Sequence, residues 1–199
     1  MFAFNRRHLA SLLFVVCALL VVGWTHGRVS HSSSPVGGAV IYVDHAATGN
    51  SDGSTWEHAY PSLQSALTAA TSGDEIWVAQ GVYKPTSTAD RTLSFAMKSG
   101  VAIYGGFAAT ETLRTERDWE TNITVLSGDI DNNDITDPNG VVTDTANIVG
   151  NNSYHVVVSN GADDTAILDG FTITSGHANL HSVPIDRGLD FTLLGEIQP

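Results

Sequence analysis

Short runs of β-forming residues dominate the chain after Asp74, and turn residues follow almost every one of them. Nearly every run ends in Gly, Asn or Asp, and neither long helical patterns nor Asn-Gly hairpin turns separate them. Strands this short and this regularly interrupted are typical of a chain that winds in coils and turns its corners with small polar residues. A jelly roll or β-sandwich is the open alternative. The runs are 76–79, 93–97, 101–104, 123–126, 155–158, 166–168 and 171–174.

The segment before these runs predicts one strand and one helix. Residues 39–43 are β-branched and aromatic and lead into a polar loop over 44–54. From 61 to 71 the apolar residues Leu63, Ala66, Leu67 and Ala70 recur at helical spacing. We expect Pro61 at the first helical position and a glycine, at position 73, just past the end.

The N-terminus predicts export. A basic stretch at 5–8 precedes an apolar run over 9–22, which has the length of a signal-peptide core and is short for a membrane span. We therefore interpret 1–27 as a signal peptide, with a retained N-terminal anchor as the alternative, and 28–38 as a linker. The protein is expected to be secreted or displayed at the cell surface, and to contact a membrane only if this segment is retained.

Composition excludes several classes of function. The 199 residues contain 9 basic and 21 acidic side chains, a net charge of −12, so we expect no nucleic acid as partner. The single cysteine, Cys17, lies in the apolar run, so the exported part has no thiol for a disulfide, a metal site or a nucleophile.

Several motifs, taken in order, resemble the N-terminal region of secreted bacterial proteins with right-handed parallel β-helix repeats, including cell-surface proteins of the polymorphic outer-membrane type. The likeness spans about 40 to 179. It implies an all-β, pectate-lyase-like fold: a right-handed parallel β-helix whose first coils follow a short N-terminal capping helix. Packing of the helix on any β-sheet is the alternative to that cap. The motifs are Ile41–Asp44, Thr48–Trp56, Leu63–Leu67, Gly73–Tyr83, Val101–Phe107, Leu126–Asp129 and Leu168–Thr174.

The likeness stops near the C-terminus. Residues 180–199 show neither the turn spacing nor the strand runs of the family, so we interpret 39–179 as the cap and first coils and 180–199 as an atypical tail. This suggests a fragment of a longer protein, whose open last coil could self-associate. A minimal version whose last coil is closed by an unrelated tail is the alternative.

One acidic loop resembles a calcium site. Asp129, Asp131, Asn133 and Asp137 place side-chain oxygens at alternate positions, as Ca²⁺ loops do. The pattern departs from an EF-hand, because its sixth residue is Asp134 and its twelfth is Gly140. Calcium is the one cofactor that the sequence suggests, and a solvated acidic turn is the alternative.

The residues favour a non-catalytic module for adhesion or for binding extracellular polysaccharide or other surface components. Asp163, Asp164 and Asp169 form a second acidic grouping with no basic residue clustered beside it in the sequence, so no catalytic residue is assigned. A remnant of a polysaccharide lyase or glycoside hydrolase is the alternative. Its site would draw on Lys84, Lys98, Arg114 or Arg117. Five aromatic residues could stack on sugar rings, although most of them are expected to be core or corner residues: Trp56, Trp77, Tyr83, Tyr104 and Trp119.

Overall fold

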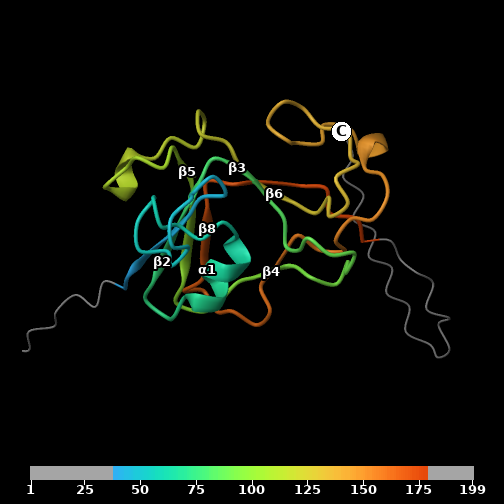
Figure 1. Cartoon of the computed structure of the whole chain (residues 1–199). Helices are drawn as coiled ribbons and strands as arrows, with labels where there is room; N and C mark the ends of the chain where they lie inside the picture. Colours follow the sequence, from blue (N-terminus) through green and yellow to red (C-terminus); the bar gives the residue numbers. More distant parts are fainter. Residues whose placement is uncertain (1–37, 179–199) are drawn as a thin grey trace, which may run out of the picture. The chain divides into compact units, whose positions relative to one another are not determined.

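The computed structural model describes residues 38–178, which fold mostly into short strands with one α-helix and two 3₁₀ turns. The predicted signal peptide or anchor, most of the linker and the atypical tail lie outside the described residues. Figure 1 shows the arrangement of the strands and α1. The elements are β1 Val40–Val43, α1 Leu63–Ala69, β2 Glu75–Ala79, β3 Gly81–Tyr83, β4 Phe95–Ala96, β5 Ala102–Phe107, η1 Arg114–Glu116, β6 Thr124–Ser127, η2 Thr145–Asn147, β7 Val157–Val158, β8 Ile167–Asp169 and β9 Thr172–Thr174.

The strands form three parallel sheets. Sheet A has the order β1-β2-β5-β8, sheet B the order β3-β6-β9, and sheet C pairs β4 with β7. After β1 and α1, strands β2, β3 and β4 lie in sheets A, B and C in that order. Strands β5, β6 and β7 repeat the same order of sheets, and β8 and β9 then lie in sheets A and B. All six strand pairings within 38–178 are parallel, so the predicted runs lie side by side and do not fold back as hairpins.

The register of strand pairing in sheet A places residues of the same type one above another in columns. Ile41 pairs with Ile76, Ile76 with Ile103, and Ile103 with Leu168. Paired residues of a parallel ladder point to the same face, and successive residues alternate between faces. This column therefore points into the main hydrophobic core, in which the first three side chains are buried and Leu168 is partly buried.

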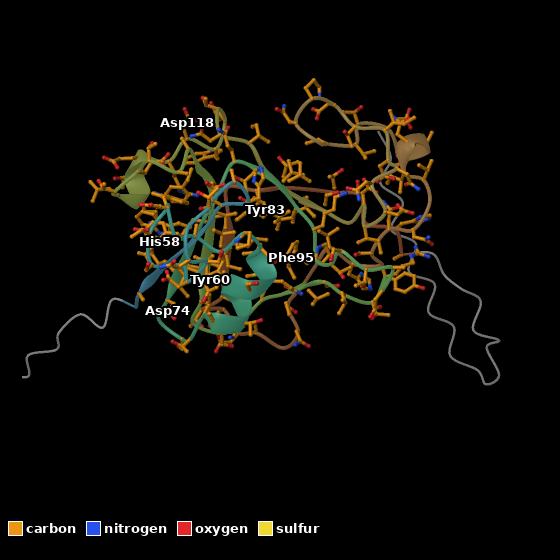
Figure 2. The ribbon with its side chains drawn as sticks, viewed as in Figure 1. His58, Tyr60, Asp74, Tyr83, Phe95 and Asp118 are labelled. Carbon is orange, nitrogen blue, oxygen red and sulfur yellow. The ribbon has the colours of Figure 1, made fainter. Side chains whose placement is uncertain are left out.

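The helix packs on this core through the face that its sequence predicts. Leu63, Ala66, Leu67 and Ala70 are all buried, and α1 contacts β1, β2 and β4. Phe95 of β4 belongs to the same core (Figure 2). At about 25 cal/mol per Å² of apolar surface, fully burying one leucine side chain contributes about 2 kcal/mol.

The ends of the helix differ from the prediction. Ser62 is the N-cap, and its Oγ accepts the Gln64 N–H at 3.2 Å, so the helix begins at Leu63 and the prediction of Pro61 as first helical residue is wrong. At the other end, Lys98 Nζ donates to the carbonyls of Leu67 at 3.0 Å and Ala70 at 2.5 Å. A cation there satisfies carbonyls that the helix leaves without partners.

Candidate functional site

A row of aromatic side chains covers the outer face of sheet A. Tyr42, Trp77 and Tyr104 pair in register and alternate with the isoleucines that point into the core. Trp77 also stacks on Phe107, with ring centres 4.8 Å apart and planes 11° from parallel. Trp56 lies edge-on to Tyr42 with ring centres 4.7 Å apart. These rings bury one another, so most of this row is a second small core and not an open surface.

Two arginines from the segment between β5 and β6 lie over this row. The Arg114 guanidinium lies 4.6 Å from the centre of the Tyr104 ring, and its Nη1 is 2.6 Å from the carboxylate of Glu75. The Arg117 guanidinium lies 5.0 Å from the centre of the same ring. Cations over aromatic faces are attracted by the ring quadrupole, so both contacts hold the segment against the sheet.

Arg117 connects this segment to β8. Its Nη2 donates to Oδ1 of Asp169 at 2.9 Å, and its Nη1 donates to the carbonyls of Gly105 and Asp169. The Arg117 side chain is 11% exposed, whereas the Asp169 side chain is 51% exposed. The guanidinium charge is therefore balanced inside the protein, while the carboxylate still faces solvent.

Trp119 is the exposed aromatic residue of this region. Its side chain is 52% exposed, and the Arg117 guanidinium lies 5.0 Å from its ring centre. The hollow beside it is lined by Trp119, Thr124, Asp169, Gly170, Phe171 and Thr172. We call this group the Trp119 hollow. It places an indole, a carboxylate and a threonine hydroxyl from β9 around one concave surface.

The backbone next to Trp119 is fixed by Gly106. The Asp118 N–H donates to the Gly106 carbonyl at 2.8 Å, and Gly106 N–H donates to the buried Thr124 hydroxyl at 2.9 Å. Gly106 has φ +93°, and a Cβ there would lie 2.8 Å from Trp119 Cα. Only glycine allows this approach without displacing the Trp119 backbone.

The turn that carries Trp119 is closed by Asp118 (Figure 2). The Asp118 carboxylate accepts the hydroxyl of Thr121 at 2.8 Å and the N–H groups of Thr121 and Glu120. The bond from the Thr121 hydroxyl is the largest of the effects that lower the pKa of Asp118. The turn is thus held by the ionised form of this side chain.

The predicted calcium residues are distributed along the excursion between β6 and β7. Asp129 is buried, its Oδ2 lies 3.3 Å from Lys84 Nζ, and its Oδ1 accepts the Asn133 N–H. Lys84 also donates to Oδ1 of Asn132 at 2.7 Å. The first predicted ligand therefore already has a cationic partner, which the sequence did not indicate.

The other predicted carboxylates hold the backbone of the same excursion. Asp131 accepts the Asn151 N–H at 2.8 Å, and Asp137 accepts the N–H groups of Asn139 and Val141, both at 2.9 Å. Within residues 38–178, no group of three or more His, Cys, Asp or Glu side chains is arranged to hold a metal ion. Calcium binding by Asp129, Asp131, Asn133 and Asp137 stays a prediction.

The second acidic grouping is divided by the fold. Asp163 closes its own turn by accepting the N–H and hydroxyl of Thr165, and this hydroxyl is the main cause of its lowered pKa. Asp169 lies on β8 beside Arg117. No basic residue is clustered with these acids in the sequence, but the β5–β8 pairing brings Arg117, 52 residues away, beside Asp169.

Of the five aromatic candidates, the structure leaves only Trp119 largely exposed. Trp77, Tyr83 and Tyr104 are buried and Trp56 is partly buried. Burial raises the pKa of the Tyr83 phenol, whose hydroxyl donates to the Ala79 carbonyl at 3.0 Å. Trp119 was one of the five candidates from the sequence, but no feature of the sequence distinguished it from the other four aromatic residues.

Comparisons with family models, with curated proteins and with solved structures found no match. No helix within residues 38–178 has the length and apolar character to cross a membrane.

Proposed function

We propose that this chain is a secreted or cell-surface module whose described part forms the first coils of a right-handed parallel β-helix. The supporting observation is the repeated order of the three sheets, in which the strands of each round pair in parallel with their equivalents in the neighbouring round. The helix α1 contacts β1 and two strands of the first round, β2 and β4, as a cap would. The apolar run at 9–22 supports export.

The module binds extracellular polysaccharide through the Trp119 hollow, without catalysis. The observation that carries this proposal is the exposed indole of Trp119 on the same hollow as the exposed carboxylate of Asp169. An indole face packs well against the C–H face of a sugar ring, and a carboxylate accepts hydrogen bonds from sugar hydroxyls. A few polar groups around an apolar platform are the usual composition of a site for small ligands.

The charge of the site favours neutral sugars over polyuronates. Arg117, a cation beside the hollow, is already balanced by Asp169 and two carbonyls. The chain as a whole carries a net charge of −12. A negatively charged polysaccharide would be repelled by such a surface.

Retention on immobilised polysaccharides, neutral and acidic, tests this function. The wild type should be retained on at least one neutral polysaccharide, and Trp119→Ala should weaken retention about tenfold or more, equivalent to about 1.4 kcal/mol. Leu113→Ala is the matched control, because Leu113 is exposed on the same segment but outside the hollow. Binding that survives Trp119→Ala would refute the site, and turnover of a polysaccharide that is lost in Asp169→Asn would support the enzyme instead.

A further inference from the structure

A second hollow adjoins the Trp119 hollow at the same short turn. Trp119 and Thr124 line the Trp119 hollow, whereas Thr121 and Ile123, which lie between them in the sequence, line the second one. The loop 136–140 forms another wall of the second hollow. We call it the Gln80 hollow, and the side chains that matter for binding are His45, Gln80, Val82, Thr121, Asp137 and Asn139.

Strand pairing places the two hollows one after the other. Gly81 lines the Gln80 hollow and pairs with Thr124, which lines the Trp119 hollow. Ile123 lies at the same corner, because its carbonyl accepts the Gly81 N–H at 3.0 Å. Neighbouring strands are about 4.8 Å apart, a separation comparable to that of successive units in a sugar chain. A ligand that leaves the Trp119 hollow along the stacking direction of the coils therefore reaches the Gln80 hollow next.

The Gln80 hollow presents an imidazole ring and a side-chain amide. The exposed ring of His45 lies edge-on to the Tyr83 ring with ring centres 5.8 Å apart. A Cβ on Gly81 would lie 2.5 Å from the His45 ring, so this ring is held closely against the Gly81 backbone. Gln80 is exposed, and its backbone is fixed because its N–H donates to the Phe107 carbonyl at 2.7 Å.

The loop on the other side of the Gln80 hollow supplies a carboxylate. Oδ1 of Asp137 accepts the N–H groups of Asn139 and Val141, both at 2.9 Å, which fixes the orientation of this side chain. The described lining of the hollow includes this carboxylate and neither lysine nor arginine. Like the Trp119 hollow, it therefore favours neutral sugars over polyuronates.

The sizes of the two hollows complement each other. The Trp119 hollow has a volume of about 240 Å³, and the Gln80 hollow has a volume of about 620 Å³. Sites for small ligands usually measure about 300–1,000 Å³, so the Trp119 hollow is small and the Gln80 hollow is of ordinary size. The Trp119 hollow thus holds only part of a sugar chain, and the Gln80 hollow has room for the units that follow.

We propose that one neutral polysaccharide chain occupies both hollows and runs along the stacking direction of the coils. One sugar packs on Trp119. The following units bind in the Gln80 hollow, where their hydroxyls donate to the Asp137 carboxylate and exchange hydrogen bonds with the Gln80 amide. The inference rests on the proposed polysaccharide function, and it adds a second binding region and the direction of the bound chain.

The length of the ligand tests whether both hollows are used. The probes are the di- to hexasaccharides of cellulose, xylan, mannan and amylose, titrated calorimetrically into the full-length chain. For the sugar that binds, wild-type affinity should rise about tenfold or more from the disaccharide to the hexasaccharide, since only the longer ligand reaches both hollows. Equal affinity for the two lengths would overturn the proposal.

Gln80→Ala tests the second hollow directly. It should weaken hexasaccharide binding about threefold to tenfold, the effect of losing one neutral hydrogen bond, and so reduce the gain over the disaccharide. The variant keeps the backbone bond to Phe107, so its fold should persist. Trp119→Ala should weaken binding of both lengths. Unchanged hexasaccharide binding in Gln80→Ala would refute the second hollow alone, whereas a wild type that binds none of the probes would refute the polysaccharide function as well.

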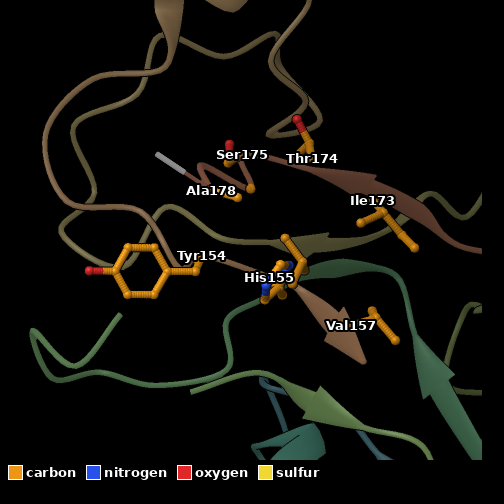
Figure 3. A pocket seen from close by; sticks show the side chains of 9 residues that line it. Tyr154, His155, Val157, Ile173, Thr174, Ser175 and Ala178 are labelled. Atoms are coloured by element: carbon orange, nitrogen blue, oxygen red, sulfur yellow. The ribbon is translucent and has the colours of Figure 1, made fainter. Parts of the chain in front are cut away.

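His45→Ala has a matched control in His155→Ala. His155 is also exposed and lines a hollow, which Figure 3 shows beside β7 and β9. That hollow shares no lining residue with the Trp119 or Gln80 hollow. His45→Ala should weaken hexasaccharide binding by at least about threefold, and His155→Ala should leave it at the wild-type value. An equal effect of the two substitutions would overturn the assignment of the Gln80 hollow.

Discussion

Arg117 donates a 2.9 Å hydrogen bond to Asp169, and through it the segment between β5 and β6 is attached to a strand of the next coil. The same guanidinium lies 5.0 Å from the ring centres of both Tyr104 and Trp119. One side chain therefore combines an ion pair, two carbonyl contacts and two aromatic contacts. This arrangement fixes the geometry of the Trp119 hollow.

Arg117→Met should lower the free energy of unfolding by about 1–3 kcal/mol, since it removes all of these contacts at once. Asp169→Asn should cost less than about 1 kcal/mol, because Asp169 is half exposed and the aromatic contacts of Arg117 persist. Urea unfolding followed by tryptophan fluorescence measures both. Losses of equal size would show that neither the aromatic contacts nor the carbonyl hydrogen bonds of Arg117 contribute to stability.

Gly106→Ala should destabilise the protein and weaken polysaccharide retention. The added Cβ would meet the Trp119 backbone, which cannot yield as a flexible side chain would. We expect a loss of about 2 kcal/mol or more, of which about 1 kcal/mol comes from the positive φ. Gly161→Ala is the control, because Gly161 also has positive φ but nothing within 4 Å of a new Cβ. A similar loss in both variants would mean that the contact with Trp119 is unimportant.

Leu63→Ala should lower the free energy of unfolding by about 2–5 kcal/mol, because it opens a cavity under α1. Leu113→Ala, at a residue that is 59% exposed, should change it by less than about 0.5 kcal/mol. Thermal melts of the two variants measure the difference. A small effect of Leu63→Ala would mean that α1 does not seal the core.

Stability should fall in acid. Burial opposes ionisation of Asp74, but hydrogen bonds from the N–H and hydroxyl of Thr71 and from the Ala39 N–H outweigh it, so the pKa of Asp74 is lowered. A carboxylate with a lowered folded pKa stabilises the protein above its unfolded pKa, and this stabilisation is lost as the pH falls through the folded pKa. We expect the melting temperature to be flat near neutrality and to fall below about pH 4.

Asp74→Asn isolates this contribution, because it removes the titrating group. Its melting temperature should lie below that of the wild type at pH 7, and the gap should narrow as the pH falls from about 4 to 2. A constant gap across this range would show that ionised Asp74 does not stabilise the fold. The amide keeps one acceptor, so folding at neutral pH is expected to persist.

The sequence predicted the strand runs well but missed β3. Strand β3, Gly81–Tyr83, begins one residue after β2 ends. Its first residue, Gly81, has φ +136° and also forms the corner between the two strands, so in the sequence it looks like a turn residue. The predicted run over 93–97 is only a two-residue strand, β4, because just Phe95 and Ala96 find partners, on β7.

The site could be predicted only in part, because its members come from different coils. Trp119 and Asp169 were both named, but no spacing in the sequence places one beside the other. Pairing of β5 with β8 across 65 residues, from Ile103 to Leu168, creates that proximity. From the sequence, Arg117 was considered only as a basic residue of a possible lyase site. Its partner Asp169 could be identified only from the register of β5 and β8.

Unequal separations between paired strands have a consequence for the order of assembly. Ile76 and Ile103 are 27 residues apart, Ile41 and Ile76 are 35 apart, and Ile103 and Leu168 are 65 apart. Closing a longer loop costs more entropy before any contact compensates it. The β2–β5 contact should therefore nucleate folding and β8 should join late, which makes the strand carrying Asp169 the slowest part of the sheet to mature.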